Sequence, residues 1–398
     1  MTRRSAAARS DVPGFKVMSI VAQLERMRAA GRDVVSLTAG EPGSGAPPAV
    51  NRAAAQIHED NTVLNYSAGF GILPLREALG EHYRSWYGVE LPVERIAVTT
   101  GSSGAFVLSF LAAFDPGARV ALARPGYPAY RNILASLGIE VVDLDCGPEV
   151  RFQPTVEQLE AEVAQNGPLD GLIIASPANP TGTMIGREQL RSLAQWCTDH
   201  GAQLISDEIY HGISFGEPAV SAAEVTDDAV IISSFSKYWG MPGWRLGWTV
   251  LPEYLVDPVA RLGGNIALCA PHGSQIAAVE AFGAESMDFA QSQVAEYAAA
   301  RHLVLDALDD LGWGRVAPAD GAFYVYAHLG EHLQRFDSSE DYCAALLEEA
   351  GVAVVPGTDF DPVHGDQWVR LSLAPGKEAV EEGLRRIKAF HAASRPAR

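Results

Sequence analysis

Six short apolar runs alternate with helical patterns between about Arg95 and Trp248. The runs occupy residues 96–100, 119–122, 140–144, 171–175, 203–207 and 229–233. They are continuously apolar rather than alternating, which is typical of strands buried on both faces. The pattern predicts a mostly parallel central sheet wrapped by helices, and therefore an α/β fold.

The pattern changes after Pro271. A long helical stretch over about residues 285–311 suits a connector, and strands over 321–326, 352–356 and 368–372 with a helix over 377–392 predict a second, smaller α/β unit. A chain of 398 residues is long enough for two units. We expect an N-terminal arm and part of the small unit in 1–45, the large unit in 46–284, and the connecting helix with the C-terminal small unit in 285–398.

Composition excludes several classes of protein. No segment approaches the roughly 18 uninterrupted apolar residues of a membrane span. The basic stretch Met1–Ser10 is followed by no apolar core, so a secretory signal is not expected. The net charge of −19 and the lack of a basic run argue against nucleic acid as a partner.

The cysteines indicate a reducing compartment. Cys146, Cys197, Cys269 and Cys343 are far apart and form no Cys-x-x-Cys pair. Such spacing suggests neither a disulfide framework nor a zinc site, and no other metal site is expected. We expect a cytoplasmic protein.

Ligands of open α/β sheets gather beyond the carboxyl ends of the strands. Lys237 lies there, just after the 229–233 run, and the other lysines are Lys16, Lys377 and Lys388, near the two ends of the chain. An amine shielded from water has a lowered pKa and condenses with an aldehyde. By residue type alone a solvated lysine is the commoner case, but this chain takes nearly all its positive charge from arginine.

Other strand ends carry groups that suit an anion. Arg245 and Ser234 flank Lys237, and Thr100-Gly-Ser102-Ser103 follows a strand and opens a helical pattern. A guanidinium, hydroxyls and helix N–H groups can hold a phosphate. Taken singly, Arg245 is as well explained by a surface ion pair and the Gly-Ser segment by an ordinary turn.

Two further strand ends carry Asp207, Tyr210 and Asn179. A carboxylate facing a pyridine nitrogen keeps that nitrogen protonated, while an amide and a phenol can hydrogen-bond a ring oxygen. A helix N-cap explains Asp207 equally well by itself, and a turn explains Asn179. The combination at five strand ends is what indicates a single site.

In this order, the runs Asn-Pro-Thr-Gly (179–182), Asp-Glu-Ile-Tyr (207–210) and Ser-Phe-Ser-Lys-Tyr-Trp-Gly-Met-Pro-Gly-Trp-Arg (234–245) resemble the class I/II, fold-type I aminotransferases, which are aspartate aminotransferase-like and depend on pyridoxal phosphate. The resemblance extends from Val34 to Arg370. It implies that Lys237 forms the Schiff base with pyridoxal 5′-phosphate and acts as general base, in a ping-pong transfer from an L-amino acid to a 2-oxo acid, with 2-oxoglutarate expected as acceptor.

The resemblance also implies roles for the remaining residues. Asp207 would pair with the ring nitrogen, and Asn179 and Tyr210 with the ring oxygen. The expected phosphate ligands are Ser102, Ser103, Ser234 and Arg245. Tyr127 resembles the aromatic residue that stacks on the ring, with a core aromatic as its alternative.

Substrate binding and assembly follow from the same resemblance. Arg370 would grip the substrate α-carboxylate, with Gly40 leaving space beside it and Asn179 close by. Tyr66 resembles a tyrosine that reaches the phosphate from a partner subunit. A homodimer with shared active sites is therefore implied.

The donor is less defined by the sequence. Some bacterial aspartate enzymes carry a lysine where Ser103 stands here, so an aromatic or aliphatic donor is at least as well supported as aspartate. Phe15, Trp239 and Phe323 would suit an apolar pocket or could be ordinary core. Another reaction of amino acids on the same fold, such as β-elimination, decarboxylation, cyclisation or oxidation, is the alternative. A transcriptional regulator is disfavoured because the stretch before Val34 is too short for a DNA-binding domain.

Overall fold

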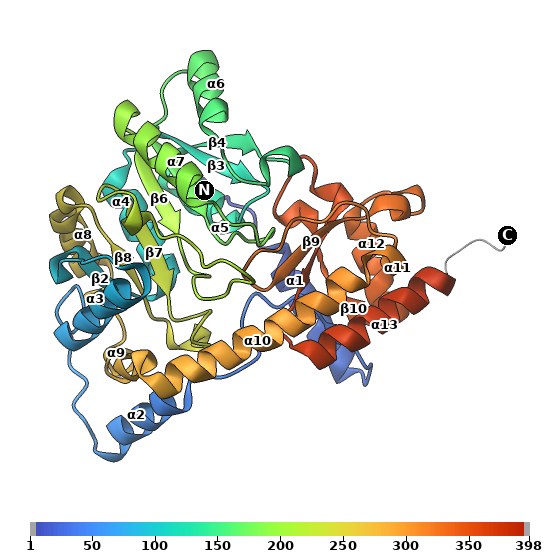
Figure 1. The fold of residues 1–398 in the computed structure, drawn as a ribbon, viewed down its shortest axis with the longest axis horizontal. Coiled ribbons are helices and arrows are strands. Elements are labelled where there is room, and N and C mark those ends of the chain that lie inside the picture. The colour runs from blue at the N-terminus through green and yellow to red at the C-terminus, as the bar shows by residue number, and fades with distance from the viewer. Residues whose placement is uncertain (1–4, 394–398) are drawn as a thin grey trace, which may run out of the picture.

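A seven-stranded sheet forms the larger part of the protein in the computed structural model, which describes residues 5–393 (Figure 1). Its order is β2-β8-β7-β6-β5-β3-β4. The strands are β2 (Ile96–Thr99), β3 (Arg119–Arg124), β4 (Glu140–Asp145), β5 (Gly171–Ala175), β6 (Gln203–Asp207), β7 (Val230–Ser234) and β8 (Gly247–Val250). β8 runs antiparallel to both of its neighbours, and the other pairs are parallel. The predicted α/β fold with a mostly parallel sheet is confirmed.

Continuous apolar runs form these central strands because both faces of the sheet are covered. Successive side chains of a strand point to opposite faces. In β5, Leu172 and Ile174 join one hydrophobic core while Ile173 joins another. In β6, Leu204 and Ile205 divide between the same two cores. Polar residues stand at the carboxyl ends of strands, as Asp207 does on β6 and Ser234 on β7.

Two smaller sheets lie in the C-terminal part of the fold. One has the order β11-β12-β9, and the other pairs β1 with β10. Their strands are β1 (Val35–Ser36), β9 (Tyr324–His328), β10 (Val352–Ala353), β11 (Val355–Pro356) and β12 (Trp368–Ser372). Because β1 is parallel to β10, a segment near the N-terminus is built into the C-terminal unit.

Two of the predicted strands differ in detail. The strand expected over 321–326 starts only at Tyr324, because Ala322 has a positive φ of 57° that breaks the extended backbone. The strand expected over 352–356 is divided between two sheets, since Val352–Ala353 pairs with β1 and Val355–Pro356 with β12. The expected strand at 368–372 is confirmed as β12.

Helices cover both faces of the central sheet, connect the two parts and pack on the smaller sheets. They are α1 (Lys16–Ala29), α2 (Pro48–Glu59), α3 (Leu73–Tyr87), α4 (Gly101–Ala113), α5 (Pro128–Leu137), α6 (Val156–Asn166), α7 (Arg187–His200), α8 (Glu253–Ile266), α9 (His272–Ala278), α10 (Ala284–Asp306), α11 (Leu308–Leu311), α12 (Ser339–Ala345) and α13 (Lys377–Ala393). The connector predicted over 285–311 is α10 with the short α11. α10 runs from the side of α2 to the side of α13 (Figure 1).

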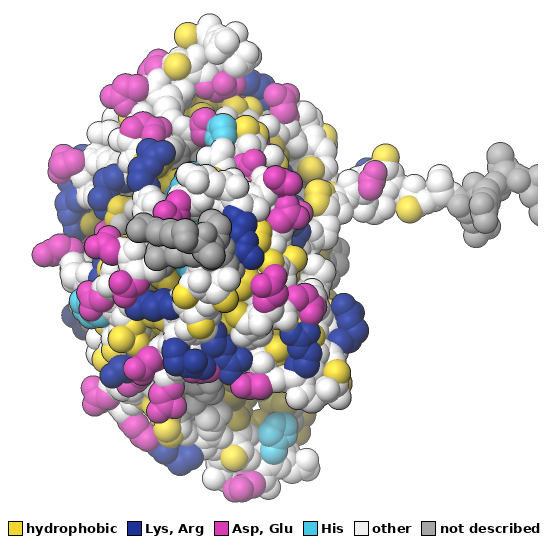
Figure 2. Space-filling model, turned by 90° about the vertical axis from the view of Figure 1, so that its right-hand side faces the viewer, with side chains coloured by type: hydrophobic (Ala, Val, Ile, Leu, Met, Phe, Trp, Pro, Cys, Tyr) yellow, Lys and Arg dark blue, Asp and Glu magenta, His cyan; other side chains and the backbone are white. Residues whose placement is uncertain are grey.

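Surface charge is mixed on the face drawn in Figure 2. Lys and Arg side chains are interspersed there with Asp and Glu, and no continuous basic area covers this face. Among residues 5–393, none of the helices combines the length and the apolar character needed to cross a membrane.

Candidate active site

Lys237 lies three residues beyond the end of β7, in a turn held by local hydrogen bonds. Ser236 N donates to Ser234 Oγ (3.0 Å), and Met241 N donates to Phe235 O (3.1 Å). The turn directs the lysine side chain toward the segment after β1, where its Nζ donates to Gly40 O at 2.5 Å. Two predicted site residues that are 197 positions apart in the chain therefore meet.

The pKa of the Lys237 amine lies close to neutral pH. Burial lowers its pKa to about 8. Glu41 and Asp207 act against this shift, and the charges of Arg370 and Arg245 reinforce it. A lysine of ordinary pKa is almost wholly protonated at pH 7.5, so the shift raises the share of nucleophilic amine.

Asp207 ends β6 and is 4% exposed. Its Oδ1 accepts a hydrogen bond from Ile209 N (3.1 Å), and its Oδ2 accepts one from the phenol of Tyr130. Burial raises the pKa of Asp207 to about 6, while these hydrogen bonds and Lys237 hold it down. The result is a buried carboxylate that gains strongly from a cationic partner.

Arg370 lies on β12 and is 3% exposed. Its Nη1 donates to Asn179 Oδ1 (2.9 Å) and its Nη2 to Thr38 O (2.8 Å). The guanidinium carbon lies 4.3 Å from the ring centre of Tyr324 and 4.8 Å from that of Phe360. Its Nε is buried and has no hydrogen-bond partner. The guanidinium is thus fixed in orientation and keeps an N–H donor free at Nε. Both features suit the binding of a carboxylate.

Tyr210 and Tyr324 join the two parts of the site. Their hydroxyls are 2.8 Å apart, and the Lys237 Nζ lies 5.8 Å from the centre of the Tyr210 ring. A Cβ added to Gly40 would lie 3.5 Å from the Tyr324 hydroxyl, an ordinary contact distance, so Gly40 lies directly beside this pair of tyrosines. Burial raises the pKa of Tyr210 well above its ordinary value, which keeps its phenol a hydrogen-bond donor.

Strand β8 brings together the residues that the sequence predicts to bind a phosphate. Gly247 is the register partner of both Thr99 on β2 and Ser234 on β7. This pairing brings the start of α4, with half-buried Ser102 and exposed Ser103, beside buried Ser234.

Arg245 reaches the same place from the turn before β8. A Cβ on Gly101, whose φ is +66°, would lie 2.6 Å from Arg245 Nη2, so only glycine allows this approach. The guanidinium and the N-terminus of a 13-residue helix therefore face one space.

Tyr127 lies just before α5 and is half-buried. Its ring stacks against Phe15 with 6.0 Å between ring centres, and it meets Tyr130 edge-on at 5.4 Å. Phe15, one of the three aromatic residues considered for a substrate pocket, therefore packs against Tyr127, an expected site residue. Phe323 packs on Tyr210 and Tyr324.

Two of the sequence-based candidates lie elsewhere. Trp239 is core, because it is 3% exposed, packs on Phe235 and donates to Ala281 O. Tyr66 is 80% exposed. It lines a cavity of about 860 Å³ that is also bordered by Trp244 and by Thr100, the N-cap of α4. In one chain it stands apart from the group around Lys237.

Sequence reasoning missed Tyr130, Tyr324 and Phe360. Tyr130 lies in the first turn of α5, three positions after the N-cap residue Tyr127, and this spacing is a local signal that the two rings meet. Tyr324 and Phe360 depend on how β9 and the segment before β12 fold against Arg370, and no local pattern reports that.

Comparison with known proteins adds independent findings. The family model described as "Aminotransferase class I and II" matches residues 32–387. The chain is 48% identical over 390 residues to the "Valine--pyruvate aminotransferase" of Mycobacterium tuberculosis, covering 97% of this chain and 98% of that one.

Solved structures agree in fold. A crystal structure of an aminotransferase from Mycobacterium tuberculosis has a TM-score of 0.94 and 46% identity, covering 98% of this chain and all of that one. The aspartate aminotransferase from Thermus thermophilus with maleate has a TM-score of 0.90 and 30% identity, again covering 98% of this chain and all of that one.

Proposed function

The chain belongs to the class I and II aminotransferase family, and from that premise we propose that Lys237 holds pyridoxal 5′-phosphate and that the enzyme moves an amino group from an L-amino acid to a 2-oxo acid. The observation that carries the proposal is the half-buried amine of Lys237. It lies 2.5 Å from Gly40 O and is electrostatically coupled to both Asp207 and Arg370.

The residues present fit the cofactor group by group. Lys237 suits the aldehyde, and the buried carboxylate of Asp207 suits a protonated ring nitrogen. The phosphate would be held by Ser102, Ser103, Ser234, Arg245 and the start of α4. Asn179 and Tyr210 offer an amide and a phenol to the ring oxygen, and Tyr127 offers an aromatic face.

Each side chain then has a task in the reaction. Arg370 binds the substrate α-carboxylate and fixes the Cα–H bond relative to Lys237. The bound cofactor supplies an electron sink for the negative charge that develops at Cα. Lys237, as a neutral amine, takes the proton from Cα and acts as general base. In a ping-pong scheme the oxo-acid product leaves before the second oxo acid binds in the same place.

The donor that we propose is an uncharged L-amino acid such as valine. The name of the Mycobacterium tuberculosis relative supports an aliphatic donor. The serine at position 103, where some aspartate enzymes carry lysine, favours an uncharged substrate side chain. For the acceptor, 2-oxoglutarate is our expectation from the sequence, and pyruvate is the oxo acid in that relative's name.

A half-reaction screen tests the assignment. Purified protein loaded with pyridoxal 5′-phosphate is mixed with single amino acids, the change in cofactor absorbance is recorded, and then pyruvate or 2-oxoglutarate is added. Valine is expected to convert the cofactor with stoichiometric oxo-acid release, and the preferred acceptor to restore it. Release of ammonia or hydrogen peroxide in place of a new amino acid would instead identify another reaction on the same fold.

Lys237→Ala is the decisive variant, and Lys377→Ala, an exposed lysine at the start of α13, is its matched control. Lys237→Ala is expected to lose turnover and the absorption band of the lysine-linked cofactor, whereas Lys377→Ala keeps both. Retention of both by Lys237→Ala would overturn the proposal.

Assembly and organisation complete the proposal. A homodimer with shared active sites is supported by the exposure of Tyr66 (80%), Val63 (73%) and Leu64 (45%) along one segment. The division into 1–45, 46–284 and 285–398 is supported by the pairing of β1 with β10. A cytoplasmic location is supported by four free cysteines, three of them buried.

A further inference from the structure

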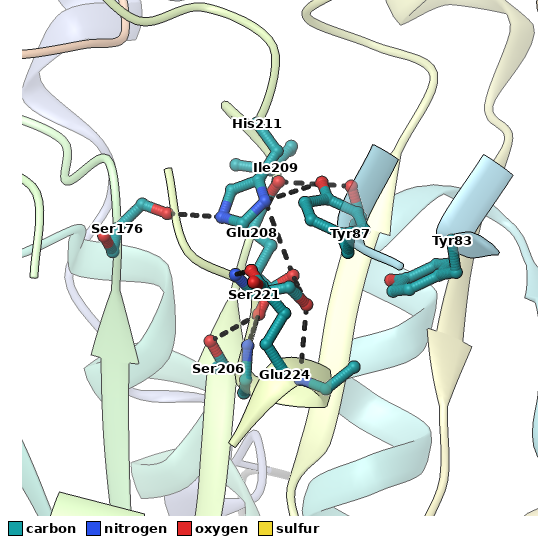
Figure 3. A network of polar contacts seen from close by, with 12 residues as sticks. Tyr83, Tyr87, Ser176, Ser206, Glu208, Ile209, His211, Ser221 and Glu224 are labelled. Carbon is teal, nitrogen blue, oxygen red and sulfur yellow. Dashed lines mark hydrogen bonds and ion pairs between the residues drawn. The ribbon is translucent and has the colours of Figure 1, made fainter. Parts of the chain in front are cut away.

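The imidazole of His211 lies between Ser176 and Tyr87 (Figure 3), and so reaches from the segment that carries Tyr210 to the one that carries Asn179. His211 directly follows Tyr210 and is 6% exposed. Its Nε2 is 2.9 Å from Ser176 O, the carbonyl three residues before Asn179. Its Nδ1 is 2.8 Å from the hydroxyl of Tyr87, at the end of α3.

The partners determine the tautomer of this ring. A carbonyl oxygen can only accept a hydrogen bond, so Nε2 carries the proton and donates to Ser176 O. Nδ1 then accepts from Tyr87. Burial lowers the pKa of His211 to about 4, so the ring is neutral at physiological pH and keeps this single arrangement.

Hydrogen bonds of Glu208 hold the turn that carries His211 against the central sheet. His211 N donates to Glu208 O (3.0 Å), and Glu208 N donates to Ile232 O on β7 (2.8 Å). The Glu208 side chain accepts from Ser206 Oγ (3.0 Å), Ser221 Oγ (2.7 Å) and Ala222 N (2.7 Å). The imidazole is therefore fixed to the central sheet as well as to its two hydrogen-bond partners.

This contact begins where the sheet no longer holds the two segments together. The ladder between β5 and β6 ends at the pair Ala175 and Asp207, followed by one bond from Ser176 N to Asp207 O (3.2 Å). Beyond that point Asn179 and Tyr210 lie on separate loops. The His211 Nε2–Ser176 O bond is a side-chain link between those loops.

We propose that His211 is a positioning residue, which holds the Asn179 loop and the Tyr210 turn at the separation needed for the amide and the phenol to bind one oxygen of the cofactor ring. This inference rests on the proposed function. Hydrogen bonds weaken steeply as angle and distance depart from the optimum, so two donors from two loops converge on one acceptor only if the loops are held together.

The chain offers a matched series of variants. In His211→Gln the amide nitrogen reaches about as far as Nε2 and can still donate to Ser176 O, whereas His211→Asn reaches only as far as Nδ1 and keeps the Tyr87 contact alone. His211→Ala removes both. His82→Ala controls for loss of a buried imidazole, since His82 is 5% exposed and packs among aromatic rings nearby.

The readout is cofactor affinity rather than turnover. Dissociation constants are measured on cofactor-free protein for pyridoxal 5′-phosphate and for 3-deoxypyridoxal 5′-phosphate, which lacks the ring oxygen. Wild type is expected to prefer the natural cofactor. His211→Ala and His211→Asn lose about tenfold in affinity for it, with no more than about a twofold change for the deoxy analogue. His211→Gln and His82→Ala keep the wild-type preference.

The outcomes separate the two proposals. Failure of the wild type to bind pyridoxal 5′-phosphate overturns the proposed function and the inference with it. If the wild type binds it but shows no preference over the deoxy analogue, or if His211→Asn keeps that preference, the inference alone is overturned. Should His211→Ala not fold, the comparison of His211→Gln with His211→Asn, two side chains closer in size to histidine, still decides.

Discussion

The phenol of Tyr130 donates a hydrogen bond to Oδ2 of Asp207, although 77 positions separate the two residues in the chain. This bond favours the ionised carboxylate, whereas burial disfavours it and raises the pKa of Asp207 to about 6. Tyr130 therefore helps to keep Asp207 charged, as the proposed pairing with a protonated ring nitrogen would require.

Tyr130→Phe is expected to raise the pKa of Asp207 further, because burial is then less opposed. In wild type, affinity for pyridoxal 5′-phosphate should fall as the pH drops through about 6 and Asp207 takes up a proton. In the variant, this fall should begin at higher pH, and kcat at pH 7 should be lower by about tenfold. Cofactor dissociation constants measured from pH 5 to 8 check the shift.

Tyr254→Phe is the control for that series. The side chain of Tyr254 is 61% exposed, and the substitution removes only its hydroxyl, which donates a hydrogen bond to Gln203. It should leave the pH profile unchanged. An unmoved profile in Tyr130→Phe would show that Asp207 does not depend on the phenol.

Glu208 gives a prediction on stability. Burial raises the pKa of this 1% exposed carboxyl from about 4.5 to about 7, so folding favours its protonated form. The stability from this group is fully present below pH 4.5 and is lost as the pH rises through 7. Glu208→Gln cannot titrate. The Tm difference between cofactor-free wild type and variant should therefore move against the wild type by at least about 2 °C from pH 5 to pH 8.

Differential scanning calorimetry at several pH values measures this difference. Asp207 and His211 also titrate with shifted pKa values, and most of their contribution is common to the two proteins. The part that differs comes from Glu208 itself, whose charge raises the pKa of Asp207 and whose Oε2 lies 3.6 Å from His211 Nδ1. Glu81→Gln removes an exposed carboxylate paired with Arg84 and should give a nearly constant difference. A constant difference for Glu208→Gln as well would mean that Glu208 stays ionised in the folded state.

Local pattern was sufficient for most of the central sheet. The runs at 171–175 and 203–207 are fully matched by β5 and β6, because a strand buried on both faces has consecutive apolar residues, such as Leu204 and Ile205. β8 was not predicted. Residues 247–250 are buried and include Trp248 and Val250, but their place between β2 and β7 and their antiparallel direction arise from pairing across the fold.

The residues of the candidate site likewise fall into those that local sequence predicts and those that depend on pairing across the fold. Lys237, Asp207 and Asn179 were predictable because each follows a strand end, where open α/β sheets bind ligands. Tyr324 was not, because it joins the site only through the pairing of β9 with β12, where it lies opposite Ser372, two positions from Arg370. Such contacts depend on register, which the sequence of either strand alone does not specify.

Arg370→Lys is expected to behave as a severe substitution. The guanidinium lies over the rings of Tyr324 and Phe360 and donates from both of its Nη atoms, and an ammonium group does not reproduce the two directed donors. We expect kcat/KM for the amino acid to fall at least about 100-fold, with cofactor affinity changed less than about threefold. Steady-state kinetics and cofactor titration separate the two effects. Arg385→Lys, on the exposed side of α13, is the control.

Lys237 should show its lowered pKa in the rate of cofactor capture. The neutral amine is the reactive form, so the rate constant for association of pyridoxal 5′-phosphate with cofactor-free protein should rise with pH and level off above about 8. Because Arg370 helps to lower this pKa, Arg370→Ala should move the midpoint to higher pH. Stopped-flow absorbance over a pH series measures both midpoints. Equal midpoints would contradict the coupling.

Tyr66 provides a test of shared active sites, since its 80% exposed side chain belongs to the site only if a second copy of the chain covers it. Lys237→Ala and Tyr66→Ala are each expected to be nearly inactive at low cofactor concentration. When the two are unfolded together and refolded as mixed dimers, one site combines the intact Lys237 of one chain with the intact Tyr66 of the other. Activity should then recover toward a quarter of the wild-type value, because about half of the dimers are mixed and each carries one complete site. If Tyr66 served its own chain, both sites of the mixed dimer would be defective and mixing would restore nothing.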